Sequence, residues 1–253
     1  MRIQDNTPGA GDIVRPYPWL PPVRNLDLPR TGRCIAFEGS DGAGKSTQIA
    51  LLAEHLGEEG YDVKVCSFIR NPLIEHAKAK GKWDNWDPYT MALTYGAALV
   101  DIVNREALPH LQTPNSVVVF DRYLYSIIAR SEARGCPRDW LSQLLQPAML
   151  PHQVIHLRTP VDVCFDRKAA AASTFSYWEC GIDAFGPDRL RTAGPVADYR
   201  RSFVRYQERV QQITDELRVD VPSLVIAEVL PPDRIADLIQ RHVHQTLEAR
   251  VAG

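Results

Sequence analysis

From residue 33 onward, short apolar runs alternate with longer amphipathic segments. The runs have the length and composition of buried strands, and they lie at 33–38, 62–68, 116–121, 152–158 and 222–228. The other segments carry apolar residues at helical spacing and predict helices at 45–59, 88–109, 123–134, 138–147, 160–172, 195–217 and 232–250. Because strands separated by helices need right-handed crossovers, we expect a three-layer α/β fold, with a mostly parallel five-stranded sheet flanked by helices.

The first 32 residues do not share this pattern. Six prolines in this stretch are incompatible with a regular helix or an interior strand. We therefore expect an extended or disordered arm at 1–32, followed by one domain at 33–253.

The first predicted strand runs directly into a glycine-rich loop, in the sequence Phe-Glu-Gly-Ser-Asp-Gly-Ala-Gly-Lys-Ser-Thr-Gln. Glycines let the backbone turn tightly so that its amide groups can surround phosphate oxygens. Lys45 is expected to reach the β- and γ-phosphates and Ser46 to bind Mg²⁺. The loop therefore predicts a nucleoside triphosphate site of the P-loop type. Its candidate residues are Gly39, Ser40, Gly42, Ala43, Gly44, Lys45, Ser46 and Thr47.

A second polar group follows the predicted strand at 116–121, which ends in Asp121-Arg122-Tyr123. A carboxylate at a strand end beside a phosphate loop can steady Mg²⁺, and we assign this role to Asp121. The neighbouring Arg122 can bind a phosphoryl group through two parallel hydrogen bonds. Arg70 ends the second predicted strand and is a further candidate for binding an anion.

Residues 172–194 have the composition of a lid, because small residues flank an aromatic and acidic centre. A lid excludes water and can bring cations to the transferring phosphoryl group. The glycine-rich loop contains no arginine of its own, so we expect such a cation to come from the lid region. Arg167, at the end of the helix that enters the lid, is the first candidate; a solvated helix face is the alternative for this residue.

Composition excludes several other classes of protein. The chain has 253 residues, 45% hydrophobic content and a formal net charge of -2, which argues against a dedicated nucleic-acid binder. No apolar stretch is long enough to span a membrane, and the N-terminus lacks the order of a signal peptide. The five cysteines include no CxxC pair, and Cys34, Cys66 and Cys164 are expected to be buried thiols of a cytoplasmic protein. The spacing of His242 and His244 directs their rings to different helix faces, so this pair predicts no metal site.

Three stretches together resemble the thymidylate kinase family of nucleoside monophosphate kinases. They are the glycine-rich loop with Asp41 inside it, Arg70-Asn71-Pro72, and Asp121-Arg122-Tyr123 followed by Ser126 and Ala129. The resemblance covers roughly residues 33–230. It implies ATP and Mg²⁺ at Lys45 and Ser46, and an acceptor monophosphate held by Arg70 and Arg122. It also implies that Asp41 contacts the sugar hydroxyl or orders the metal, and that two chains form a homodimer through the region 88–109.

The departures from the family lie at positions expected to form the acceptor pocket. Tyr95 can replace the aromatic residue that stacks on the base in the family, but Leu99 replaces an arginine that hydrogen-bonds to thymine. Arg130 and Ser131 replace the family's Tyr-Gln pair. A site that lacks a polar partner for its substrate discriminates poorly, so these changes predict weak selection for thymine while leaving the phosphoryl-transfer residues in place.

Three functions are compatible with these residues. The first is ATP- and Mg²⁺-dependent phosphoryl transfer to a nucleoside monophosphate, most simply dTMP. The second is the same chemistry on a modified nucleotide or another small metabolite, which the changes at Leu99, Arg130 and Ser131 favour. The third is a nucleotide-binding switch that is not a kinase; a GTPase is excluded because no Asn-Lys-x-Asp sequence is present.

Overall fold

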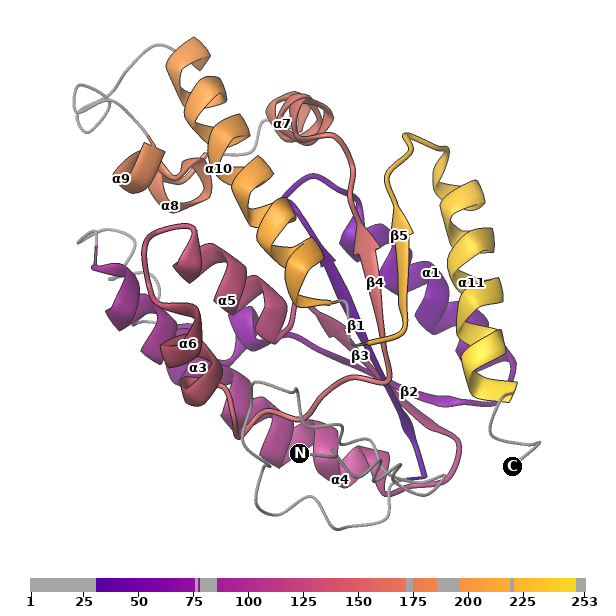
Figure 1. The fold of residues 1–253 in the computed structure, drawn as a ribbon. Helices are drawn as coiled ribbons and strands as arrows, with labels where there is room; N and C mark the ends of the chain where they lie inside the picture. Colours follow the sequence, from indigo (N-terminus) through magenta and orange to yellow (C-terminus); the bar gives the residue numbers. More distant parts are fainter. Residues whose placement is uncertain are drawn as a thin grey trace, which may run out of the picture.

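Five parallel strands form a sheet in the order β2-β3-β1-β4-β5 (Figure 1). The computed structural model describes residues 31–75, 77, 86–171, 175–185, 196–218 and 221–248. The strands are β1 (Arg33–Gly39), β2 (Asp62–Cys66), β3 (Ser116–Asp121), β4 (Gln153–Leu157) and β5 (Ser223–Ile226). The predicted α/β fold with a parallel five-stranded sheet is therefore confirmed.

Helices cover both faces of this sheet and bury a separate hydrophobic core on each side (Figure 1). One face packs against α3 (Pro88–Ile102), α5 (Leu124–Glu132) and α10 (Val196–Leu217), and the other against α1 (Lys45–Glu58) and α11 (Pro232–Glu248). Alternate residues of β1 enter the two cores, as the period of a strand requires. Within the described residues, the further α-helices are α4 (Leu108–Leu111), α6 (Arg138–Leu144), α7 (Val161–Ala170), α8 (Tyr177–Cys180) and α9 (Ile182–Phe185).

The helix predicted at 88–109 differs in detail from the observed one. It leaves α-helical geometry after Ile102, forms a π-helical turn at Val103–Ala107 and continues as α4. Pro109 explains the change, because proline has no N–H group to donate to the carbonyl of Arg105 and its ring would crowd that carbonyl. The proline therefore does not end the helix but accompanies a widened turn, after which α4 continues.

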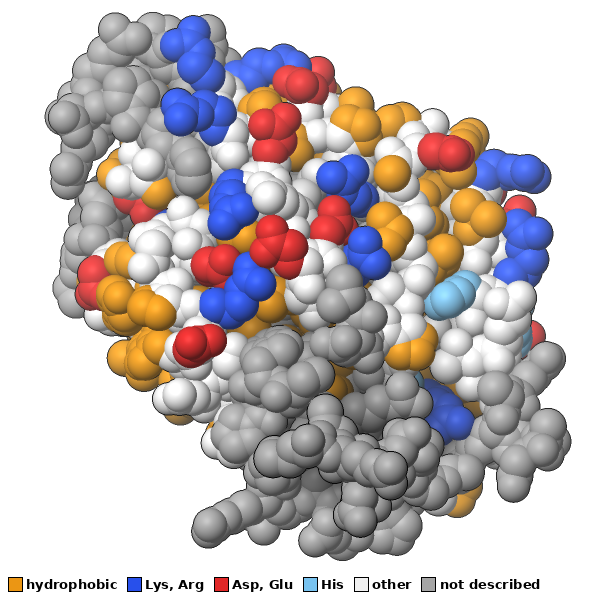
Figure 2. All heavy atoms as spheres, viewed as in Figure 1, with side chains coloured by type: hydrophobic (Ala, Val, Ile, Leu, Met, Phe, Trp, Pro, Cys, Tyr) orange, Lys and Arg blue, Asp and Glu red, His pale blue; other side chains and the backbone are white. Residues whose placement is uncertain are grey.

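Parts of the predicted organisation lie outside the described residues. These parts are nearly all of the arm at 1–32 and, within the lid at 172–194, residues 172–174 and 186–194. All five cysteines are buried and free of disulfides, as expected for Cys34, Cys66 and Cys164. In the described part of the chain, no helix combines the length and apolarity needed to cross a bilayer. On the face seen in Figure 2, cationic and anionic side chains of the described residues are interspersed.

Candidate phosphoryl-transfer site

The glycine-rich loop joins β1 to α1 and surrounds an open cavity of about 410 Å³. Gly42 has a φ of +90°, and a Cβ atom there would lie 2.4 Å from the carbonyl oxygen of Cys164, so the loop requires glycine at this position. Ser40 and Ala43, which belong to the loop, are buried. The cavity is lined by Asp41, Gly42, Gly44, Lys45, Ser46, Thr47, Ser67, Ile69, Arg70, Asp121 and Arg122. The structure thus brings the loop together with the two arginines and the aspartate predicted from separate strands.

Lys45 lies folded back against this loop. Its Nζ atom donates to the carbonyl oxygens of Gly39 and Ser40, each at 2.9 Å. Burial lowers the pKa of Lys45 to about 7, and the positive charge of Arg122 acts in the same direction. The ammonium group is therefore held where an anion would stabilise its charged form.

Arg122 and Asp41 form a partly buried ion pair at the centre of the site. Arg122 donates to Asp41 and, at 3.0 Å, to the carbonyl oxygen of Gly39, while Arg130 donates to the second Asp41 oxygen at 3.2 Å. Burial by itself would raise the pKa of Asp41, but Arg122, Arg130 and Lys45 hold it well below its ordinary value. Arg122 also has a left-handed backbone with φ of +67°, an uncommon conformation that aims its side chain at the loop.

Glu38 supports this arrangement, a role that the sequence pattern did not predict. Tyr123, the first residue before α5, provides no side-chain cap, and the Glu38 carboxylate accepts from the Tyr123 and Ser126 amides at 2.9 and 3.2 Å instead. Burial raises the pKa of Glu38 in spite of these bonds. An acidic residue from β1 thus fixes the N-terminus of the helix that carries Ser126 and Arg130.

A second, more enclosed cavity of about 170 Å³ adjoins the first. The two share Asp41, Ile69 and Arg122. Polar lining comes also from Ser126, Arg130, Ser131, Arg134 and Glu179, and apolar lining from Phe68, Met91, Tyr95, Ile127 and Trp178. The ring of Tyr95 lies edge-on to Phe68 at 5.9 Å between centroids, and burial raises the Tyr95 pKa to about 12. This cavity has apolar walls that suit a planar ring and a cationic end beside the phosphate loop.

Comparison with known proteins identifies the family. The model of the thymidylate kinase family matches residues 37–179, which include the glycine-rich loop and the Asp121-Arg122-Tyr123 segment. The chain belongs to the thymidylate kinase family. Family membership also classes it as a nucleoside monophosphate kinase, as the motifs indicated.

Relatives in this family match most of the chain. A probable thymidylate kinase 2 of Saccharolobus solfataricus is 30% identical over 77% of this chain and 86% of its own length. Thymidylate kinases of Thermomicrobium roseum and Caulobacter vibrioides are each 31% identical, over 85% and 79% of this chain and 95% and 96% of theirs.

Leu99, a candidate residue of the acceptor pocket, lies in the hydrophobic core. Its side chain is completely buried in the core beside α5, and it lines neither cavity. Tyr95, one helical turn earlier on the same face of α3, does line the second cavity together with Met91. Leu99 therefore contributes no surface to the acceptor-side cavity in this structure.

Arg70 and Asn71 occupy the loop that matches the family's Arg-Glu-Pro. Arg70 is exposed at the edge of the phosphate cavity. Asn71 is buried and donates to Asp101 at 2.8 Å and to the Ala98 carbonyl at 3.1 Å, while its own oxygen accepts from the Leu73 amide. The asparagine thus ties the loop to α3 and fixes the backbone that carries Arg70.

Arg167 lies on the other side of the loop from Arg70. It is exposed on α7 and lines a third cavity of about 270 Å³, together with Gly42, Thr47 and Pro232 at the start of α11. The described part of the predicted lid, residues 175–185, instead contributes Trp178 and Glu179 to the acceptor-side cavity. Arg167 and this part of the lid therefore border different cavities.

Arg134 holds the lid in place, a role that sequence reasoning missed. Its guanidinium is buried, pairs with Asp183 at 2.7 Å and donates to the Trp178 carbonyl. It also lies over the rings of Trp178 and Tyr206, 4.1 and 4.2 Å from their centroids. One arginine thus joins the end of α5 to α8, α9 and α10.

Proposed function

We propose that this kinase transfers the γ-phosphoryl group of ATP to a nucleoside monophosphate in a Mg²⁺-dependent reaction, most simply converting dTMP to dTDP. The observation that carries the proposal is the junction of the two cavities at Asp41, Ile69 and Arg122. Phosphoryl transfer needs a donor and an acceptor phosphate side by side and in line. A triphosphate in the loop cavity and a monophosphate in the second cavity would meet beside Arg122.

On the donor side, the loop amides and Lys45 bind the triphosphate. The hydroxyl of Ser46 and the carboxylate of Asp121 line the same cavity and are hard oxygen donors of the kind that Mg²⁺ prefers. They would hold the ion, which neutralises charge on the β- and γ-phosphates when bound. Arg167, with Leu230 and Pro232, borders the neighbouring cavity and is available to the rest of the nucleotide.

On the acceptor side, Arg122 binds the monophosphate and Arg70 approaches it from the loop cavity. In the free enzyme Asp41 pairs with both Arg122 and Arg130. A phosphate dianion competes with Asp41 for these guanidinium groups, so its binding loosens the ion pair and leaves Asp41 available for the metal or the sugar. The positive groups then surround the equatorial oxygens as charge develops on them.

The base is expected to lie against Tyr95, in the part of the cavity that Met91 and Trp178 also line. An acceptor other than dTMP, such as a modified nucleotide, is the second candidate, and one observation favours it. Arg130 and Ser131 both line this cavity where the family has Tyr-Gln, so the polar groups offered to the substrate differ. The relatives named above are described as thymidylate kinases, which favours dTMP.

A screen of acceptors tests the proposal. ADP release from MgATP is measured with nucleoside monophosphates, nucleosides and sugar phosphates, and each product mass is determined. We expect one acceptor to gain a phosphoryl group at the rate of ADP release, and Lys45→Met to abolish the reaction while the protein remains folded. Slow ATP hydrolysis that no acceptor accelerates would instead support the nucleotide switch.

We further propose that two chains pair through α3. Tyr89 and Leu93 lie one turn apart on this helix and are 43% and 51% exposed, which gives it an apolar outer stripe. Light scattering of the wild type and of Leu93→Glu measures the association. A dimer that becomes monomeric in the variant is expected, and a monomeric wild type would refute the pairing.

A further inference from the structure

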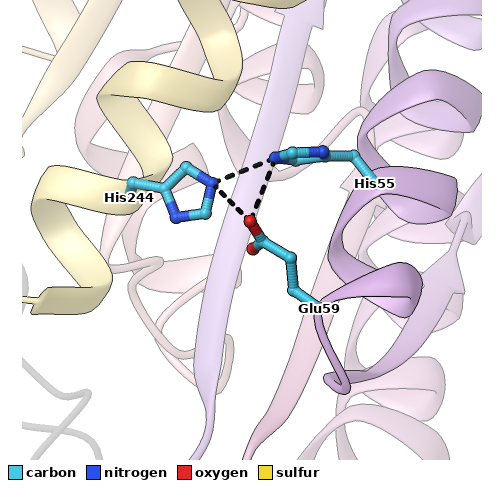
Figure 3. A group of neighbouring side chains, drawn as sticks. All are labelled: His55, Glu59 and His244. Carbon is cyan, nitrogen blue, oxygen red and sulfur yellow. Dashed lines mark hydrogen bonds and ion pairs between the residues drawn. The ribbon is translucent and has the colours of Figure 1, made fainter.

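A cluster of metal-ligating side chains lies between α1 and α11, away from the phosphate loop (Figure 3). His55 belongs to the last part of α1, Glu59 follows that helix directly, and His244 comes from α11. Figure 3 shows the three side chains pointing at one another across the gap between the two helices. His55 lies ten residues after Lys45, so about 15 Å of helix separates it from the start of α1.

We propose that His55, Glu59 and His244 bind a divalent transition-metal ion, with Zn²⁺ as the first candidate. Two imidazoles and a carboxylate are a ligand set that zinc uses in proteins, and imidazole also suits copper and nickel. The site is distinct from the proposed Mg²⁺ site at Ser46 and Asp121, which offers oxygen donors.

The distances between the donor atoms fit one shared ion. The two Nε2 atoms are 3.0 Å apart, and Glu59 Oε1 lies 3.5 Å from that of His55 and 3.3 Å from that of His244. With zinc–ligand bonds of about 2.0–2.1 Å, neighbouring ligands are separated by about 3.4 Å in tetrahedral geometry and about 3.0 Å in octahedral geometry. All three separations therefore lie close to the values that one ion imposes.

Hydrogen bonds among the three side chains leave one donor atom badly paired, whereas a metal ion would bind all three. If both Nε2 atoms carry hydrogen and donate to Glu59, two N–H groups face each other at 3.0 Å. If one Nε2 donates to the other, the lone pair of the acceptor nitrogen faces the Glu59 oxygen at 3.3 Å. Each arrangement leaves one pair of like groups in contact, whereas a cation accepts electron density from all three atoms.

The surroundings leave room for water to complete the coordination. The three side chains are 29–36% exposed, and His55 and His244 line an open groove of about 490 Å³. Gln48 of α1 already donates to the Pro232 carbonyl at the start of α11 at 2.9 Å. An ion between His55 and His244 would join the same two helices near their other ends, so we expect it to stabilise their packing without taking part in phosphoryl transfer.

The test uses the full chain, stripped of metal with a chelator and kept reduced with a phosphine. Zn²⁺ is titrated calorimetrically without nucleotide, Co²⁺ is followed by its visible absorption, and melting is recorded with and without Zn²⁺. We expect one saturable Zn²⁺ site per chain, a rise in melting temperature and Co²⁺ bands typical of nitrogen and oxygen ligands. His55→Gln and His244→Gln should each weaken binding by more than about tenfold, since even loss of a residue supporting a ligand costs 10–100-fold.

His110→Gln is the matched control, because His110 lies on α4 and contacts Asp62 away from this cluster. It should bind Zn²⁺ like the wild type. Circular dichroism of the metal-free variants establishes that each is folded. The proposal is overturned if the wild type shows no saturable Zn²⁺ binding, if the two cluster variants bind as tightly as the wild type, or if Co²⁺ shows thiolate bands.

Discussion

The protonation of Lys45 should make nucleotide binding depend on pH. Burial lowers its pKa to about 7 in the free enzyme, and the nearby charge of Arg122 contributes to the lowering. A triphosphate binds the charged ammonium, so the bound form keeps its proton to higher pH. Well below pH 7 the lysine is already charged, so its protonation no longer changes the affinity for the nucleotide. Above pH 7 binding requires uptake of a proton, and affinity falls.

The size of this effect follows from linkage. Where the free lysine is neutral and the bound one charged, Kd rises tenfold per pH unit. Between pH 7 and pH 9 the loss is about 50-fold, or about 2.3 kcal/mol, because half of the lysine is already neutral at pH 7. Calorimetry of a non-hydrolysable ATP analogue, in buffers with different ionisation enthalpies, measures both Kd and the protons taken up. Uptake should be near half a proton at pH 7 and approach one at pH 9.

Arg122→Gln provides an internal control. Removing this positive charge should raise the pKa of Lys45 and move the onset of the affinity loss to higher pH, whereas Lys45→Met should bind weakly with no such dependence. A Kd that stays constant from pH 7 to pH 9, with no proton uptake in the wild type, would refute the reasoning.

Three further substitutions separate the roles of individual positions. Gly42→Ala should weaken nucleotide binding by roughly 1–3 kcal/mol in a titration, because its Cβ would lie 2.4 Å from the Cys164 carbonyl oxygen at a φ of +90°; unchanged affinity would show that the loop tolerates a side chain. Leu99→Ala should lower the free energy of unfolding in urea by about 2–5 kcal/mol and leave the order of preference among acceptors unchanged; an altered order would mean that this residue reads the base. Arg134→Gln removes the ion pair with Asp183, a loss of about 1.5–3 kcal/mol, and should raise the acceptor KM about 10–100-fold with a smaller effect on the ATP KM. Equal effects on the two KM values would show that Arg134 has no specific role at the acceptor cavity.

Local patterns explain why much of the fold was predictable from the sequence. The apolar run before Gly39 and the stripe that follows Lys45 are signals within a few residues, and the β1 and α1 boundaries match them closely. Asp121 and Arg122 follow a buried strand, and parallel strands end at the same edge of a sheet. Their position beside the loop could therefore be predicted without knowing any contact between distant residues.

The contacts that were missed join distant parts of the chain. Arg134 meets the Trp178 carbonyl 44 residues away, and nothing near Arg134 in the sequence distinguishes it from a solvated arginine. His244 meets His55 across 189 residues, so helical spacing could exclude a site with His242 but could not reveal this one. Leu99 lies on the same face of α3 as Tyr95, so the sequence pattern could not show that packing covers Leu99 while Tyr95 reaches the cavity.

The central claim is that donor and acceptor phosphates bind side by side across Arg122, and a linked inhibitor tests it most directly. The compound joins adenosine to the accepted nucleoside through five phosphates, so it fits only if the two cavities bind both substrates at once. Its inhibition is measured while MgATP and the acceptor are varied in turn. The account predicts competitive inhibition against both substrates. Competition with ATP but not with the acceptor would contradict it.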